Sequence, residues 1–393
     1  MNLAPYAGGQ RLIKASALAG VVGLLLTLAL GFLDPRRVLF SYVVAFVFWV
    51  GIAVSAIILL GTFHASNAKW PVVLRRFVET MPLSLPVLLA LLLPILLGMR
   101  VLFPWMDVAG LDPGLQETAR WRAPYLNRNF FVVRGIFYFA FWWITAHLLH
   151  AWSVKQDAVG GVALTVWQRR LGSASLPFLA VTMSFASFDW MMSLDLRFFS
   201  TIFGVYWFAG SFTAVFAVIA IVGAASRGDP TMFGHHMSLE HFHSVGKFML
   251  AFVAFWAYMA FSQFMLIWIA NIPEEVPWYV VRIHGGWTPV FWFLVLLKFV
   301  VPFFLLLSRD LKRNPVTLAG MGAWLLFTQW IDVYWMVMPA LSPDGPRPHL
   351  ADLTALVGIG GVAVAYTTWR LRGAATVPLQ DPYLTESLRY VPR

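Results

Sequence analysis

The chain has 393 residues, of which 60% are hydrophobic and only 12% are charged, and its mean hydropathy is +0.74. An ordinary soluble domain is excluded, because such domains are about 45–50% apolar and about 25% charged. The chain has no Cys, which excludes thiolate zinc sites, Cys-ligated iron–sulfur clusters and CxxCH haem attachment. The net charge of +10 is typical of a polytopic membrane protein with basic cytoplasmic loops, and we expect no nucleic-acid partner.

Ten segments are long and apolar enough to cross a bilayer, which takes about 20 residues in a helix. The predicted spans are Ile13–Phe32, Val38–Thr62, Met81–Phe103, Phe130–Trp152, Leu176–Leu194, Thr201–Ala224, Val245–Asn271, Trp287–Ser308, Leu318–Met338 and Ala351–Trp369. No small-residue cleavage site follows the first span, so we expect it to be retained rather than removed as a signal peptide.

The distribution of basic residues predicts the orientation. Ten spans place both termini on one side, and that side carries 17 of the 28 Lys and Arg residues, while the opposite side carries 9. Cytoplasmic loops are enriched in Lys and Arg, so both termini are expected to be cytoplasmic. We expect a multi-pass membrane protein.

The predicted fold class is an all-α polytopic membrane protein with two four-helix bundles and two extra N-terminal helices. The expected boundaries are 1–80 for the N-terminal helices and an interfacial segment, 81–224 and 225–370 for the bundles, and 371–393 for a cytoplasmic tail. Within the interfacial segment, Arg75 and Arg76 are expected to point to lipid headgroups. The two bundles are expected to correspond, since the second helix of each carries a cation (Arg134, Lys298) and the third an acid (Asp189, Asp332).

Ionisable residues within the spans are candidates for a proton path, because buried charge is costly in a membrane and therefore usually functional. The candidates are Lys298, Asp332, Asp189, Arg134, His147, His150 and Glu79. Two structural interpretations stay open: a simple ion pair between Arg134 and Asp189, and interhelical hydrogen bonding by the polar stripe of Gln329 and Asp332.

Histidines offer little sign of a metal or haem site. His147 and His150 share a helix face, but no spacing selects a partner histidine on a second helix for haem. Four histidines gather near Glu240 in one loop, where solvated side chains are commoner than a metal site; they are His235, His236, His241 and His243. No usable nucleotide-binding or nucleophile motif is present. We therefore expect no cofactor held by this chain alone, with a quinone as the one open alternative.

Four stretches of the chain resemble one family. They are SFDWMMSL (187–194), FSTIFGVY (199–206), FWAY (255–258) with FMLIWIANIPEE (264–275), and DVYWMVMP (332–339). Together they resemble the ActF subunits of bacterial alternative complex III, a quinol:cytochrome c oxidoreductase, which are NrfD-like integral membrane proteins. The resemblance runs from about the third span to the tenth.

The resemblance implies two four-helix bundles, a place in the bacterial inner membrane and a set of partners. These partners are an ActC-like membrane subunit beside the chain, and iron–sulfur and multihaem cytochrome subunits that hold the complex's clusters and haem. It implies roles for Asp189, Asp332, Tyr334 and the segment Asn271–Glu275. The family often has an acidic-Pro-His stretch before the FST motif, and this chain has Asp195-Leu196-Arg197 there, so no role tied to that histidine is expected.

Three functional hypotheses follow from the sequence. The first is a subunit that moves protons in a quinol-oxidising complex, without a redox centre and without catalysis of its own. The second is a quinone-binding NrfD-like subunit in which His147 or Asp189 takes the quinol proton. The third is a secondary transporter with a site between the bundles.

Overall fold

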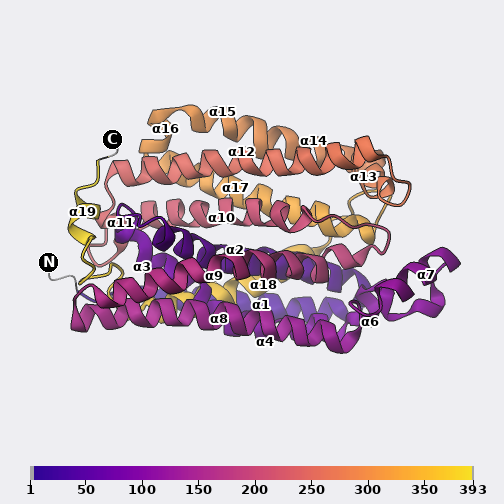
Figure 1. Cartoon of the computed structure of the whole chain (residues 1–393), viewed down its shortest axis with the longest axis horizontal. Helices are drawn as coiled ribbons and strands as arrows, with labels where there is room; N and C mark the ends of the chain where they lie inside the picture. The colour runs from indigo at the N-terminus through magenta and orange to yellow at the C-terminus, as the bar shows by residue number, and fades with distance from the viewer. Residues whose placement is uncertain (1–3, 392–393) are drawn as a thin grey trace.

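The computed structural model describes residues 4–391, which are 79% helical and include no strand. Ten helices in this part of the chain are long and apolar enough to cross a membrane, which confirms the prediction of an all-α polytopic membrane protein. The helices run along one long axis, and both chain ends lie at the same end of the molecule (Figure 1). We call this end, with α3, α11, α16 and α19, the terminal end, and the opposite end, with α7 and α13, the far end.

Six candidate spans are single helices and four are composed of consecutive helical segments. In chain order the elements are α1 (Gln10–Gly31); α2 (Pro35–Ala65); α3 (Val72–Thr80) with η1 (Met81–Ser84), α4 (Leu85–Ala90) and α5 (Leu93–Leu97); α8 (Arg128–Val159); α9 (Ala163–Trp190) with η4 (Met192–Leu194); α10 (Phe203–Ala225); α12 (Leu239–Ala270); η5 (Gly285–Trp287) with α14 (Thr288–Phe293), η6 (Leu294–Val300) and α15 (Val301–Leu307); α17 (Pro315–Val337) with η7 (Met338–Ala340); and α18 (Leu350–Leu371).

Short helices lie in the connections. They are α6 (Met99–Leu102), η2 (Pro104–Met106), η3 (Val108–Gly110), α7 (Pro113–Arg122), α11 (Phe233–His236), α13 (Val276–Ile283), α16 (Arg309–Arg313) and α19 (Leu384–Leu388). The long connection 104–127 contains α7. Segment η6 is a π-helix, and it carries Lys298.

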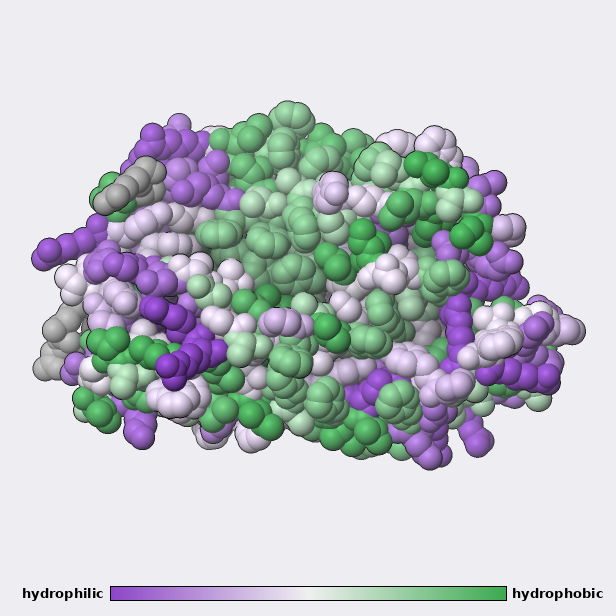
Figure 2. Space-filling model, in the orientation of Figure 1, coloured by the Kyte–Doolittle hydropathy of each residue, from purple (hydrophilic) through white to green (hydrophobic). Residues whose placement is uncertain are grey.

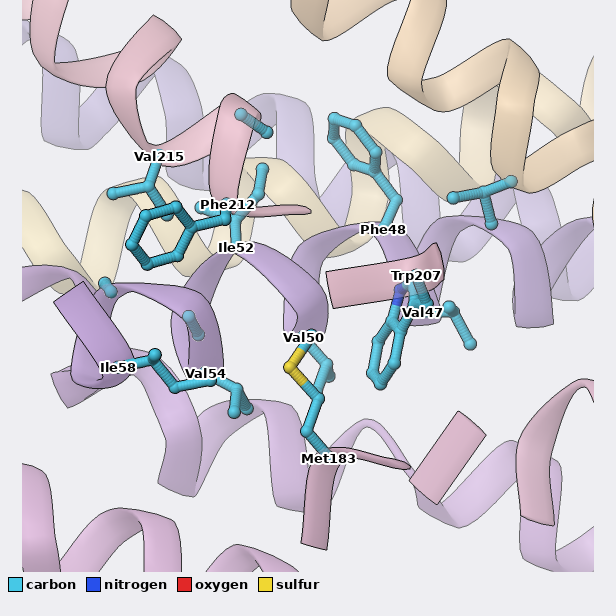
Figure 3. Close-up of a cluster of buried hydrophobic side chains, with 14 of the residues drawn as sticks. Val47, Phe48, Val50, Ile52, Val54, Ile58, Met183, Trp207, Phe212 and Val215 are labelled. Carbon is cyan, nitrogen blue, oxygen red and sulfur yellow. The ribbon is translucent and has the colours of Figure 1, made fainter. Parts of the chain in front are cut away.

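Helix α2 is the central element of the fold. Its most apolar stretch is 94% buried, whereas the corresponding stretch of α1 is 17% buried. It packs against α9, α10, α17 and α18. Figure 3 shows its Val50 and Ile52 beside Met183 of α9 and Phe212 of α10. An apolar helix that is hydrophobic all round in this way belongs in the interior of a bundle.

The contacts group the helices differently from the predicted boundaries at residues 80 and 224. One ring of four consists of α2, the third span, α8 and α9, and a second consists of α10, α12, the eighth span and α17. Helix α18 packs on α1 and α2 instead of joining the second bundle. The helices outside the two bundles are therefore the first and the last, α1 and α18. Small residues allow these two helices to pack against each other.

Glycines bring the backbones of α1 and α18 close together. A Cβ on Gly20 would lie 2.6 Å from the backbone nitrogen of Val362, and one on Gly23 would lie 2.7 Å from that of Gly358. Small residues that let two backbones approach are the usual basis of helix association in membranes.

The start of the third span is also different from the prediction. Residues 72–80 form α3, which is buried throughout and continues directly into η1, so it belongs to the third candidate span and is not a separate surface helix. Arg75 and Arg76 do not point to headgroups. They are 4% and 1% exposed, because carboxylates from α3 itself, α8 and the C-terminal tail neutralise them.

The molecular surface matches a membrane environment. Figure 2 shows apolar side chains over the middle of the visible face and hydrophilic side chains gathered towards both ends. Many of the exposed side chains are large and hydrophobic, among them Leu18, Phe178 and Phe304. Such a surface is stable against lipid chains and would be an aggregation hazard in water.

The close contact of α1 and α18 predicts a position-specific effect of one methyl group. Gly23→Ala is expected to destabilise the protein by about 1–3 kcal/mol, because the new Cβ overlaps the backbone of α18. Gly31→Ala in the same helix is the matched control, since the nearest atom to its Cβ would be 3.8 Å away. Thermal unfolding in detergent measures both, and equal stability of the two variants would contradict the close packing.

Candidate functional site

A buried carboxylate, Asp332, lies at the centre of the second bundle. Asp332 has no exposed surface, and its neighbours come from the other three helices of that bundle. Lys298 of η6 donates to its Oδ2 at 2.6 Å, Trp256 of α12 donates to the same oxygen at 3.0 Å, and Tyr206 of α10 donates to its Oδ1. We call Asp332, Lys298, Tyr206, Trp256 and Gln329 the Asp332 cluster.

Lys298 is held by more than its ion pair. Its Nζ donates to Gln329 Oε1 at 2.6 Å and lies 4.2 Å from the centre of the Trp256 ring. Gln329 reaches this position because Gly210 leaves room for it; a Cβ there would lie 2.1 Å from Gln329 Oε1. The cluster thus contains an acid and a base, both of which can exchange protons. Neutral side chains hold these two groups in place.

The first bundle contains a second buried carboxylate, Asp189 of α9. Arg134 of α8 donates to both of its oxygens, from Nε at 2.9 Å and from NH2 at 2.7 Å. Tyr138 of α8 also donates to Oδ2, at 2.9 Å. The guanidinium of Arg134 stacks on the ring of Tyr125 at 3.8 Å, and burial raises the pKa of this tyrosine, which keeps it neutral.

The two carboxylates occupy corresponding places in the two bundles. In each bundle a cation of the third helix, α8 or the eighth span, pairs with an acid of the fourth, α9 or α17. The sequence-based correspondence of Arg134 with Lys298 and of Asp189 with Asp332 is therefore matched by two ion pairs. The helices that carry them are one position later in each bundle than predicted, because the bundles begin one span earlier.

A third ionic group lies at the terminal end of the first bundle. Glu79 is 1% exposed and lies 3.2 Å from both Arg75 and Arg76. Its Oε2 is also 3.7 Å from Nδ1 of His150 on α8. Arg76 contacts Asp157 at 2.9 Å. The candidates Glu79 and His150 therefore belong to one compact ionic network with Arg75, Arg76 and Asp157.

The C-terminal tail closes this network from outside. Asp381 accepts from Arg75 at 2.6 Å, and Ser387 accepts from the backbone of Val73 at 3.1 Å and donates to that of Trp70 at 2.6 Å. The sequence predicted a cytoplasmic tail at 371–393, and the structure shows how the described part of this tail is held. It packs on α3 and supplies one carboxylate to a buried ion network.

Three sequence candidates lie apart from these groups. His147 is exposed on the outer face of α8 and stacks on Trp143, whereas His150 is buried. Tyr334 is buried between Trp287 and Trp330, and its hydroxyl has no partner among the described residues. Residues 271–275 form the turn after α12, where Asn271 ends the helix in the left-handed conformation.

The histidine-rich loop does not converge on a common point. His235 and His236 each contact a backbone carbonyl, of Arg227 and Pro230, and His241 caps α12 through Ser238. Among residues 4–391 there is no group of three or more His, Asp or Glu side chains that could hold a metal ion.

Sequence reasoning missed several members of the buried polar groups. Tyr206 and Trp256 were not recognised as partners of Asp332, since hydrogen-bonding roles of aromatic residues leave no sign in hydropathy. A further ion pair, Arg37 of α2 with Asp352 of α18 at 2.6 Å, was also missed. Asp352 could have been noticed, because it is an acid near the start of an otherwise apolar span.

A polar stripe on α8 runs between the two levels of charge in the first bundle. Tyr138 and His150 are about three turns apart, roughly 18 Å along the helix axis. Between them, Trp142 donates to Thr182 at 2.9 Å and Thr145 donates to the backbone of Phe141. The one ionisable side chain of α8 in this interval, His147, is exposed on the outer face of the helix, so protons inside the bundle would need water to cross it.

No family model and no curated protein matches the sequence. The functional interpretation therefore depends on the geometry of these groups and on the resemblance of the four stretches.

The Arg134–Asp189 pair is expected to respond more to single than to double substitution. Asp189→Asn and Arg134→Gln each leave one buried charge without its partner, which costs about 3–5 kcal/mol. The double variant Arg134→Met with Asp189→Leu removes both charges and is expected to be more stable than either single variant. Denaturant unfolding in detergent measures the three, and strictly additive losses would contradict a tight ion pair.

Proposed function

We propose that this chain is the ActF-like membrane subunit of a respiratory quinol:cytochrome c oxidoreductase, and that it takes part in proton translocation without a redox centre of its own. The observation that carries the proposal is the Asp332 cluster. It places an acid and a base in contact inside a membrane-like bundle, and charge at such a place is usually functional.

The convergence of the family-like stretches supports the same conclusion. Tyr206 ends the stretch 199–206, Trp256 lies in 255–258, and Asp332 begins 332–339. These three residues come from three different helices and meet at one carboxylate. The fourth stretch, 187–194, contains Asp189, the acid of the other bundle.

The chemistry of the Asp332 cluster is that of a coupled acid and base. A proton that arrives at Asp332 neutralises the carboxylate and leaves Lys298 as a buried cation without a counterion. This favours release of a proton from Lys298 towards the other side, after which the ion pair can form again. Tyr206, Trp256 and Gln329 keep the two groups in register during the exchange.

A second route would run through the first bundle. His150 and Glu79 would exchange protons with the aqueous phase at the terminal end, and Asp189 lies towards the far end of the same bundle. Internal water would link these levels past Trp142 and Thr182. In the proposed bacterial inner membrane the terminal end faces the cytoplasm, and the iron–sulfur and multihaem subunits cover the far end beside an ActC-like subunit.

A cavity favours a second candidate function, the binding of quinone. It has a volume of about 490 Å³ and an almost wholly apolar lining between α12 and the eighth span, which includes Phe264, Phe299 and Trp335. Its inner wall includes Tyr206 and Trp256 of the Asp332 cluster. A cavity of this size suits a ring with an apolar tail, and Tyr206, whose hydroxyl donates to Asp332, would connect the ring to the Asp332 cluster.

Copurification tests the proposed complex. The tagged chain, extracted from its native membrane with mild detergent, is expected to bring a multihaem cytochrome, a large iron–sulfur protein and a second polytopic subunit with it. Visible spectra and mass spectrometry identify them, and extraction with organic solvent measures quinone. A colourless chain that emerges alone would contradict the complex, and one quinone per isolated chain would instead support the second candidate.

Proton translocation tests the role of the Asp332 cluster. In liposomes that contain the whole complex, Lys298→Met and Asp332→Asn are expected to lower vectorial proton movement, because each removes one exchanging group. Quinol-driven pH changes, read with an entrapped dye, measure this against the rate of cytochrome reduction.

The matched control is His147→Gln, which changes an ionisable residue on the exposed face of α8 and is expected to leave proton movement unchanged. Haem content of each preparation verifies assembly. Normal proton yields in both cluster variants would show that Lys298 and Asp332 are structural.

A further inference from the structure

The far end contains a pocket that the proposed proton path does not use. It has a volume of about 290 Å³, and four connections between spans meet around it. Pro104 comes from the connection after the third span, Asp195 and Arg197 from the one after the fifth, Arg282 from the one after the seventh, and Pro343 from the one after the ninth. We call it the far-end pocket.

Arg282 is the chemically unusual residue of this pocket. Its side chain is 3% exposed, and it donates to two backbone carbonyls, of Trp278 at 2.8 Å and of Met336 at 2.9 Å. Its Nε has no partner among the described residues, and its guanidinium lies 3.6 Å from the centre of the Trp278 ring.

The contrast with the other buried arginines is the key observation. Of the five arginines buried within residues 4–391, Arg37, Arg75, Arg76 and Arg134 each have a carboxylate within 4 Å, and Arg282 has none. Asp195 acts on Arg282 only at longer range, and its carboxylate accepts from the backbone of Arg197 at 2.9 Å. Burial lowers the pKa of Arg282 to about 9, which reflects how incompletely its charge is compensated.

We propose that the far-end pocket receives a carboxylate side chain of a protein partner, and that this carboxylate neutralises Arg282. The inference rests on the proposed function in so far as the partner is a subunit of the complex. A cation that the fold leaves uncompensated is complementary to an acid from outside, and charge pairs of this kind give an interface its register.

The position of the pocket favours a protein over a lipid. Four connections frame it at the end of the bundle, so its opening lies among loops and not along the apolar sides of the spans. Proline residues form much of its wall, including Pro104, Pro277 and Pro339, and their fixed backbone angles keep the pocket open without a ligand. Preformed walls reduce the entropy lost when a side chain enters. The exposed Arg197 at the pocket adds attraction for an acid.

The first experiment uses the fact that the chain has no Cys. A single thiol, Pro343→Cys, is placed at the exposed rim of the pocket, and a matched thiol, Gly228→Cys, is placed in an exposed loop at the terminal end. Maleimide labelling of this chain is then read by mass spectrometry. The rim thiol is expected to react at least about tenfold more slowly in the whole complex than in the isolated chain, and the control thiol is expected to react equally in both.

A photo-crosslinker attached to the rim thiol identifies the occupant. The expected product is a partner peptide with an Asp or Glu within a few residues of the crosslink. Arg282→Gln is expected to weaken retention of that partner by about tenfold or more in moderate salt, and Arg282→Lys to weaken it less. The crosslink is measured on the native arginine, so the result does not depend on whether the Arg282 variants fold.

The outcomes separate this inference from the proposed function. If no partner copurifies, the proposed complex fails as well. If the complex assembles but the rim thiol stays fully reactive, or crosslinks only to lipid or to a segment without an acid, the far-end pocket is not the carboxylate site and the proposed function stands.

Discussion

A charge that is buried at the depth of an apolar bundle must be neutralised by a neighbour, and this requirement determines how the helices of this chain pair. Placing a charged side chain at the centre of a membrane helix costs about 2.5–3.5 kcal/mol on insertion scales. The chain buries Arg37, Arg134 and Lys298 within or beside its spans, and each lies against a carboxylate on another helix. Because one unpaired member of such a pair is strongly destabilising, each pair specifies which helix lies next to which.

The two bundles share this design around one apolar axis. Helix α2 belongs to the first bundle but also packs on α10 and α17 of the second, so it joins the two units. Its side chains are almost all apolar where they are buried, and the polar groups lie inside the rings on either side. The charged clusters of the two bundles are therefore separated mainly by apolar side chains, and protons that used both bundles would follow two routes.

The sequence predicts the ten spans and the correspondence of the charges, because hydropathy and intramembrane charge are properties of single residues. It does not predict the grouping of the helices. The association of α1 with α18 depends on Gly23 meeting Gly358, which is a matter of shape between residues far apart in the chain. Likewise, Arg75 and Arg76 resemble headgroup anchors in the sequence. Their burial is stable because Asp381 and Asp157, which are distant in the chain, form ion pairs with them.

The two central ion pairs are not chemically equivalent, and this difference assigns them different tasks. Arg134 donates two parallel hydrogen bonds to Asp189 and keeps its charge at all physiological pH values. This pair is therefore suited to hold α8 against α9. Lys298 makes a single contact with Asp332 and a second with the neutral Gln329, and an ammonium group can release its proton when it is buried. Lys298 also lies in a π-helical segment, a departure from α-helical geometry that is frequent at functional sites. The second bundle therefore has the exchangeable pair, and the first has a fixed positive charge whose field a proton on Asp189 would have to overcome.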